Sequence, residues 1–129
     1  MKLSYVILYV QNVGRAVDFY ERAFGLPRRF IHESQQYAEL ETGATTLALV
    51  AAELAGAQLP GGITANDPSL PPAGIEVAFT TADVPAAYER AVKAGARAIA
   101  APQAKPWGQT VAYVRDLDGV LVELCTPMS

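Results

Sequence analysis

Apolar residues along the chain alternate between two patterns, one typical of strands and one typical of helices. Residues 3–10 form a short β-branched and aromatic run, which predicts a strand buried on both faces. An apolar stripe at helical spacing follows, made of Val13, Ala16, Val17, Tyr20 and Phe24. Asn12 before it favours a helix N-cap, and Gly25 after it favours a helix stop. The start of the chain therefore predicts a strand followed by a helix.

The rest of the first half predicts three short strands and then an irregular connection. The strand-like runs are separated by turn residues and cover residues 29–32, 36–41 and 45–50. Residues 55–73 are rich in Gly and Pro and show no periodicity, which predicts a linker or a flexible flap. The first half therefore has the order β-α-β-β-β.

The second half repeats this order. Residues 76–81 predict a strand, Asp83 a second N-cap and Gly95 a second helix stop. Further strands are predicted at residues 97–100, 110–115 and 120–125. A shift of about 71 residues superposes Asn12 on Asp83. We therefore interpret the chain as one domain with an internal repeat: module one (1–54), a linker (55–73) and module two (74–129).

Composition narrows the class of protein. The 129 residues suffice for one compact domain, and 51% hydrophobic against 18% charged residues indicates a folded one. Ten basic and thirteen acidic residues give a formal net charge of −3 without a basic run, so we expect no nucleic-acid and no membrane partner. The single cysteine and the short apolar start favour a cytoplasmic location. Phosphate-binding glycine loops and a G-x-S-x-G motif are absent from the sequence.

The chain resembles the vicinal oxygen chelate superfamily, the group of glyoxalases, bleomycin-resistance proteins and extradiol dioxygenases. The residues that carry the resemblance are 6–13 with 16–20 and 24–26, then 106–109, and the Asp-x-Asp-Gly-x-x-x-Glu pattern from Asp116 to Glu123. The resemblance implies an α+β fold in which two tandem βαβββ modules form a curved mixed sheet with a cavity, with the helices on the convex face. It also implies a homodimer that binds a small organic molecule.

Enzymes of this family hold a divalent metal through one side chain from the first and one from the last strand of each module. By resemblance these positions fall on Tyr5 and near Ala48 in module one, and on Glu76 and Glu123 in module two. Imidazole is the usual ligand for such ions, and the only histidine is His32, which we expect at the surface. We therefore predict no obligatory cofactor, with a weak divalent metal site on the two glutamates as the alternative.

Glu76 and Glu123 are the candidate catalytic or ligand-orienting residues. If both face the cavity, they share a proton and act as a general base, or they bind a cationic or hydroxyl-rich ligand. The alternatives are that one lies at a solvated rim or pairs with a cation such as Arg115. Cys125 is interpreted as a buried apolar residue rather than a nucleophile.

Four aromatic residues and one glutamine are the other candidate ligand-binding residues. Tyr5 and Tyr9 share a strand face, and Tyr113 adds a further flat surface. Trp107 lies on a loop, where it serves as a lid or stacking platform or fills a gap between modules. Gln109 either donates to a ligand carbonyl or caps a strand end. Each alternative stays open at the level of sequence.

Three functions remain possible. The first is binding of a small organic molecule without an obligatory metal. The second is a divalent-metal-dependent lyase, isomerase or dioxygenase that uses Glu76 and Glu123. The third is a metal-free enzyme in which one of these glutamates abstracts a proton. The sequence does not decide whether a reaction is catalysed.

Overall fold

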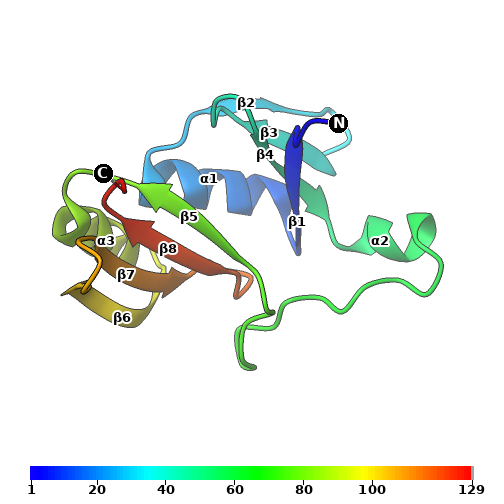
Figure 1. Cartoon of the computed structure of the whole chain (residues 1–129). Coiled ribbons are helices and arrows are strands. Elements are labelled where there is room, and N and C mark those ends of the chain that lie inside the picture. Colours follow the sequence, from blue (N-terminus) through cyan, green and yellow to red (C-terminus); the bar gives the residue numbers. More distant parts are fainter. Residues whose placement is uncertain (129) are drawn as a thin grey trace. The chain divides into compact units, whose positions relative to one another are not determined.

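The structure is a computed structural model that describes residues 1–128 and has an α+β architecture with two four-stranded sheets (Figure 1). The elements run in the order β1 (Tyr5–Val10), α1 (Val13–Phe24), β2 (Arg28–Ile31), β3 (Tyr37–Leu40), β4 (Thr46–Ala51), α2 (Glu53–Gln58), β5 (Glu76–Thr80), α3 (Val84–Lys93), β6 (Arg97–Ala104), β7 (Thr110–Arg115) and β8 (Leu121–Cys125). The predicted βαβββ order is therefore present twice.

Contacts within the chain define two compact units. Unit 1 comprises Met1–Glu21 and Gly25–Ala65, and unit 2 comprises Arg22–Phe24 and the chain from Asn66 onward. The last turn of α1 therefore clusters with unit 2. None of the helices among the described residues is long and apolar enough to cross a membrane.

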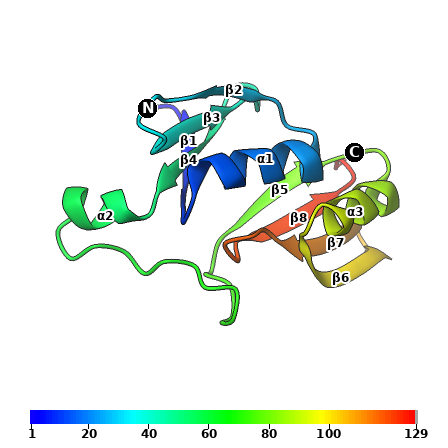
Figure 2. The same cartoon turned by 180° about the vertical axis from the view of Figure 1, so that it is seen from behind.

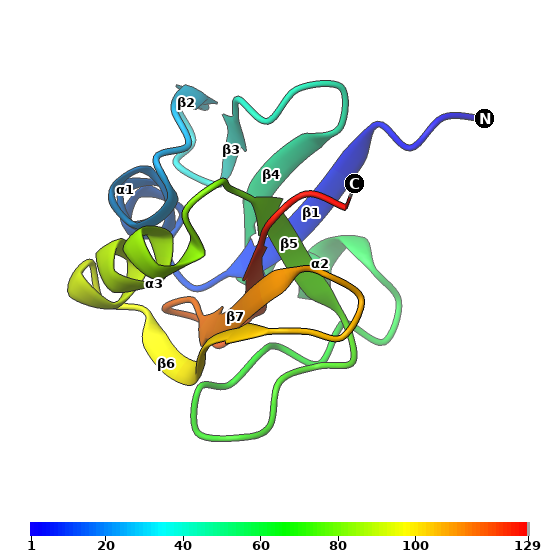
Figure 3. The same cartoon turned by 60° about the vertical axis from the view of Figure 1, so that its left-hand side comes forward.

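The sheet of unit 1 has the order β1-β4-β3-β2, with β1 parallel to β4 and the other pairs antiparallel (Figure 3). Four residues of the apolar stripe of α1 are buried as its spacing predicts, whereas Phe24 at its end is half-buried. Asn12 caps the helix by accepting a hydrogen bond from the Arg15 backbone N–H at 2.9 Å, and Gly25 ends it in the left-handed conformation with φ 68°. The two helix boundaries predicted from the sequence are confirmed.

Strand β1 is buried on one face only, which corrects the prediction of burial on both faces. Leu8 and Val10 are buried, whereas the Tyr5 and Ile7 side chains are 52% and 45% exposed. The prediction failed because a run that is apolar at every position does not show which face of the strand packs against the core.

The sheet of unit 2 has the same topology, in the order β5-β8-β7-β6 with β5 parallel to β8. Helix α3 lies against β6, β7 and β8 (Figure 2). Asp83 caps α3 through a hydrogen bond from the Ala86 backbone N–H at 3.1 Å. The register agrees between the units, because Ile7 is opposite Ala48 in unit 1 and Ala78 is opposite Glu123 in unit 2. Tandem modules are therefore shown by topology and register together.

The connection between the modules is more ordered than its composition predicts. Helix α2 extends into its first residues. This helix was not predicted, because the segment contains Gly56 and has no apolar stripe. Farther along, the buried Arg115 guanidinium donates to the backbone oxygens of Leu70 at 2.7 Å, Pro68 at 3.3 Å and Asp67 at 3.2 Å. Residues 67–70 are therefore held against unit 2 and do not form a free flap.

Strand β6 is also longer than expected, because it continues to Ala104 instead of ending at Ala100. The added part of the strand contains Pro102, although proline cannot donate a hydrogen bond to a sheet. It is tolerated because β6 is an edge strand whose pairing with β7 is interrupted by register shifts.

Candidate functional site

Strand alternation in unit 2 brings the predicted glutamates to one face of the sheet. Glu123 on β8 is opposite Tyr113 on β7 and opposite Ala78 on β5, and Glu76 is two residues before Ala78. Glu76, Tyr113, Glu123 and Cys125 therefore share one face, which we call the open face of unit 2. The alternate residues of β7 and β8, such as Val114 and Val122, are fully buried. Both glutamates therefore lie on the same face of the sheet, and their role in a ligand cavity stays a prediction.

Tyr113 and the two glutamates form one interacting group. The Tyr113 hydroxyl donates to Glu123 Oε1 at 3.0 Å. Glu76 is an exposed residue, but desolvation of its carboxyl raises its pKa, and the charge of Glu123 and a hydrogen bond with it raise that pKa further. Burial and the same Glu123 carboxylate raise the pKa of Tyr113. The raised pKa of Glu76 is therefore what is expected when two neighbouring carboxyl groups compete for one proton.

No basic side chain neutralises this pair among the described residues. Within the part of the chain that the structure describes, neither Glu76 nor Glu123 takes part in an ion pair. Arg115, the cation proposed as a partner, instead binds backbone oxygens, including that of Gly119 at 2.8 Å. The open face of unit 2 therefore presents acidic groups to a ligand.

Cys125 lies on the same face but is buried. Burial is the main cause that raises the pKa of its thiol to about 11, and Glu123 and Glu76 add to the effect. A thiol in this state is protonated at neutral pH and is a poor nucleophile. The interpretation of Cys125 as a buried residue is confirmed.

The corresponding face of unit 1, the open face that carries Tyr5, Ile7 and Tyr9, has different chemistry. Ala48 occupies the position of Glu123 and is fully buried. A carboxylate is present instead on the neighbouring strand, where Glu39 is opposite Ala48. The predicted position of Ala48 in the register is therefore correct, but the functional groups of the two modules are not equivalent.

Glu39 is nearly buried and its charge is compensated. Arg29 Nη1 lies 2.9 Å from Glu39 Oε1, and the Tyr37 hydroxyl donates to Glu39 Oε2 at 2.6 Å. Burial and then the hydrogen bond with Glu39 raise the pKa of Tyr37 to about 12. The sequence reading missed this group, although the alternation of Tyr37 and Glu39 in one strand would have placed both on the same face.

Trp107 and Gln109 form the turn between β6 and β7. The Trp107 side chain is exposed, and its Nε1 donates to Gln109 Oε1 at 2.8 Å. Gln109 Nε2 in turn donates to the backbone oxygen of Thr126 at 2.7 Å. Gln109 therefore fixes the orientation of the indole, and both ends of its amide are engaged within unit 2.

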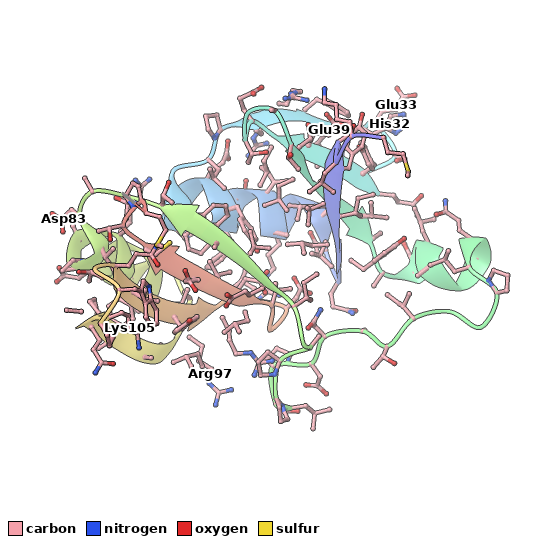
Figure 4. All side chains as sticks on the ribbon, viewed as in Figure 1. His32, Glu33, Glu39, Asp83, Arg97 and Lys105 are labelled. Atoms are coloured by element: carbon pink, nitrogen blue, oxygen red, sulfur yellow. The ribbon has the colours of Figure 1, made fainter. Side chains whose placement is uncertain are left out.

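The donor set does not fit the metal site that the family resemblance implies. The equivalent positions carry a phenol, a methyl group and two carboxylates, and His32 lies in the exposed turn after β2, where its Nδ1 is 2.8 Å from Ser34 Oγ (Figure 4). Within residues 1–128, no group of three or more His, Cys, Asp or Glu residues could hold a metal ion. The residues at these positions therefore do not form the metal site of the family.

The fold and the sequence together define the family. The family model described as the Glyoxalase/Bleomycin resistance protein/Dioxygenase superfamily matches residues 2–124. The chain belongs to this superfamily, as the repeated βαβββ topology also indicates.

The chain is also similar to individual proteins and solved structures. The chain is 27% identical over 125 residues to the uncharacterized protein YraH of Bacillus subtilis (strain 168), covering 96% of this chain and 97% of YraH. Its structure is similar to that of a glyoxalase-related enzyme from Fulvimarina pelagi, with a TM-score of 0.83, 20% identity, and coverage of 98% and 88% of the two chains. It is also similar to TioX from Micromonospora sp. ML1, with a TM-score of 0.72, 26% identity and 98% coverage of both chains.

Proposed function

We propose that the protein binds a small organic molecule on the open face of unit 2 and requires no metal to do so. The observation that carries this proposal is the interacting group of Glu76, Tyr113 and Glu123, which no basic side chain among the described residues neutralises. Small-molecule sites combine apolar surface with a few polar groups that orient the ligand. Membership of a superfamily that includes bleomycin-resistance proteins supports this function.

The interacting group of Glu76, Tyr113 and Glu123 favours a ligand that donates hydrogen bonds. Glu123 accepts a hydrogen bond from Tyr113, and Glu76 has a raised pKa because it lies close to Glu123. A ligand ammonium or hydroxyl group would donate to these carboxyls and relieve their mutual repulsion. The proposed ligand is therefore cationic or rich in hydroxyl groups.

Aromatic residues supply the apolar part of the proposed ligand surface. Trp107 in unit 2 is held in one orientation by Gln109. Tyr5 and Tyr9 give the open face of unit 1 an aromatic character, with the Tyr5 side chain more exposed than that of Tyr9. In unit 2 we assign ligand contact to Trp107, with Gln109 acting through the position of Trp107. Tyr5 and Tyr9 are candidate ligand-binding residues of unit 1 by itself.

A ligand screen tests the proposal. Small organic molecules are screened by thermal shift, and hits are titrated against Trp107 fluorescence. Because a ligand of the native state raises the unfolding temperature, we expect a hit to raise that of the wild-type protein. Glu123→Gln should weaken binding about tenfold, which corresponds to the loss of one charge-assisted hydrogen bond.

Two controls make the screen decisive. Glu33→Gln removes an equal charge from an exposed residue in the turn after β2, and it should leave the affinity unchanged. EDTA should also leave the affinity unchanged. Loss of binding in EDTA, or equal weakening by both substitutions, would contradict the proposal.

A second candidate function is metal-free acid–base catalysis by Glu76. The raised pKa of Glu76 favours it, because a general acid or base works best when its pKa lies near the working pH. In that case a hit from the screen is converted to product. The rate of this conversion then falls at acidic pH, and Glu76→Gln removes this acidic limb of the pH–rate profile. Unchanged hit molecules after long incubation, followed by mass spectrometry, would favour binding alone.

A further inference from the structure

Unit 2 contains a hollow on the side of its sheet opposite Glu123. Its volume is about 360 Å³, and its floor includes Phe24, Phe79 and Leu124. The Phe24 and Phe79 rings are in contact, with 5.2 Å between their centroids. Phe79 and Leu124 are register partners that alternate with Ala78 and Glu123, so they point to the other face of the sheet. This hollow is therefore separate from the open face.

A second hollow adjoins the first and is basic. Its volume is about 470 Å³, and it shares Ala86 and Arg90 with the apolar hollow. Arg22, Arg90 and Lys93 contribute positive charge to its lining, whereas Glu89 contributes the negative charge. The two hollows adjoin at these shared residues, so that one end is apolar and the other is cationic. We call the two hollows together the α3 groove.

The cations of the α3 groove are held close together by the fold. Arg22 is in the last turn of α1, and Arg90 and Lys93 are in the last turn of α3, where each stabilises its helix dipole. Arg90 Nε also donates to the backbone oxygen of Arg22 at 2.8 Å, which fixes the two helix ends side by side. Among the described residues, Arg22 and Lys93 form no ion pair. An anion in the groove would therefore find two cations without an ion pair, Arg22 and Lys93, to interact with.

We propose that the α3 groove is a second binding site, specific for a small amphipathic organic anion such as an aromatic carboxylate or sulfonate. The apolar part of the ligand contacts Phe24 and Phe79, and the acid group faces Arg22, Arg90 and Lys93. Asp83 favours this orientation, because it also lines the apolar hollow and its negative charge would repel an acid group placed there. The volume of the apolar hollow is within the range of small-molecule sites, roughly 300–1,000 Å³.

Titration with 8-anilinonaphthalene-1-sulfonate tests the proposal, because this aromatic sulfonate becomes fluorescent in apolar surroundings. We expect saturable binding of one molecule per chain, with displacement by 1-naphthoate and none by the neutral 1-naphthalenemethanol. Arg22→Gln and Lys93→Gln should each weaken binding about threefold and together about tenfold, as for partly exposed ion pairs.

Controls on the same protein separate this site from the proposed ligand site. Lys105→Gln removes one positive charge from the β6–β7 turn and should not change the affinity. Glu123→Gln should also have no effect, since Glu123 is on the other face of the sheet. Equal weakening by Lys105→Gln, or displacement by the neutral alcohol, would overturn the proposal. One bound molecule per two chains, lost on dilution, would assign the groove to a contact between copies and would overturn it as well.

Discussion

The carboxylates of the two modules differ in whether a basic side chain compensates their negative charge. In unit 1, Glu39 is almost buried and is compensated by Arg29 and Tyr37. In unit 2, Tyr113 occupies the position of Glu39, and the carboxylates Glu76 and Glu123 face each other instead. A compensated carboxylate stabilises its own module, whereas an uncompensated pair stores repulsion that a ligand can relieve. This difference places the proposed chemistry in unit 2.

The repulsion at Glu76 predicts a pH-dependent effect on stability. Its pKa is raised in the folded protein, so the folded state holds the proton more tightly than the unfolded state does. The resulting stabilisation is complete below the unfolded pKa, about 4.3, and is lost as the pH rises through the raised folded pKa. Glu76→Gln should therefore match the wild type near pH 4 and be more stable than it near pH 8.

Urea unfolding of both proteins at the two pH values measures this difference. Glu33→Gln is the control, because it removes an exposed glutamate from the β2–β3 turn. Its stability relative to the wild type should depend little on pH. A Glu76→Gln effect of equal size at both pH values would show that the carboxyl pair does not compete for a proton.

At the scale of elements, the sequence predicted the helix boundaries, which depend on interactions between residues close together in the chain. The caps Asn12 and Asp83 and the stop at Gly25 are set by hydrogen bonds within a few residues, and all three were predicted. The anchoring of residues 67–70 was not predicted, because it depends on Arg115, more than forty positions away in sequence. The pairing of Glu39 with Arg29 was also missed, although the two residues are only ten positions apart, because it depends on the register between β2 and β3.

The anchored connection predicts a strong effect of Gly119→Ala. Gly119 has φ +93°, and an added Cβ would lie 2.8 Å from Arg115 Nη2 and 3.0 Å from the backbone nitrogen of Pro68. The substitution should therefore strain the turn and also displace Arg115 from residues 67–70. We expect a loss of more than about 1 kcal/mol in the free energy of unfolding and faster proteolysis within residues 66–71.

Gly108→Ala is a matched control for this experiment. Gly108 has a similar φ of +99°, but nothing lies within 4 Å of an added Cβ. It should lower stability through backbone strain alone and leave the proteolysis of residues 66–71 unchanged. Equal cleavage in the two variants would mean that Arg115 does not hold the connection.

At the scale of the whole molecule, exposed apolar surface favours association. Ile7, Tyr5 and Phe30 in unit 1 are 45%, 52% and 40% exposed, respectively. The edge strand β1 also leaves backbone groups without a partner strand on its outer side. A second copy related by a two-fold axis can cover both features at once, since such an interface uses the same surface twice. We therefore propose that the protein is a homodimer.

Sedimentation equilibrium should give twice the chain mass of 13.7 kDa. Ile7→Lys places a charge on the open face of unit 1, so it should shift the equilibrium toward the monomer. Ile99→Lys is its control, because Ile99 is exposed to a similar extent, 48%, on β6 of unit 2. If the wild type sediments as a monomer at every concentration, or if both variants dissociate equally, β1 is not the association surface. Dissociation by Ile7→Lys alone would link the open face of unit 1 directly to assembly, since the two substitutions differ only in the sheet that carries the charge.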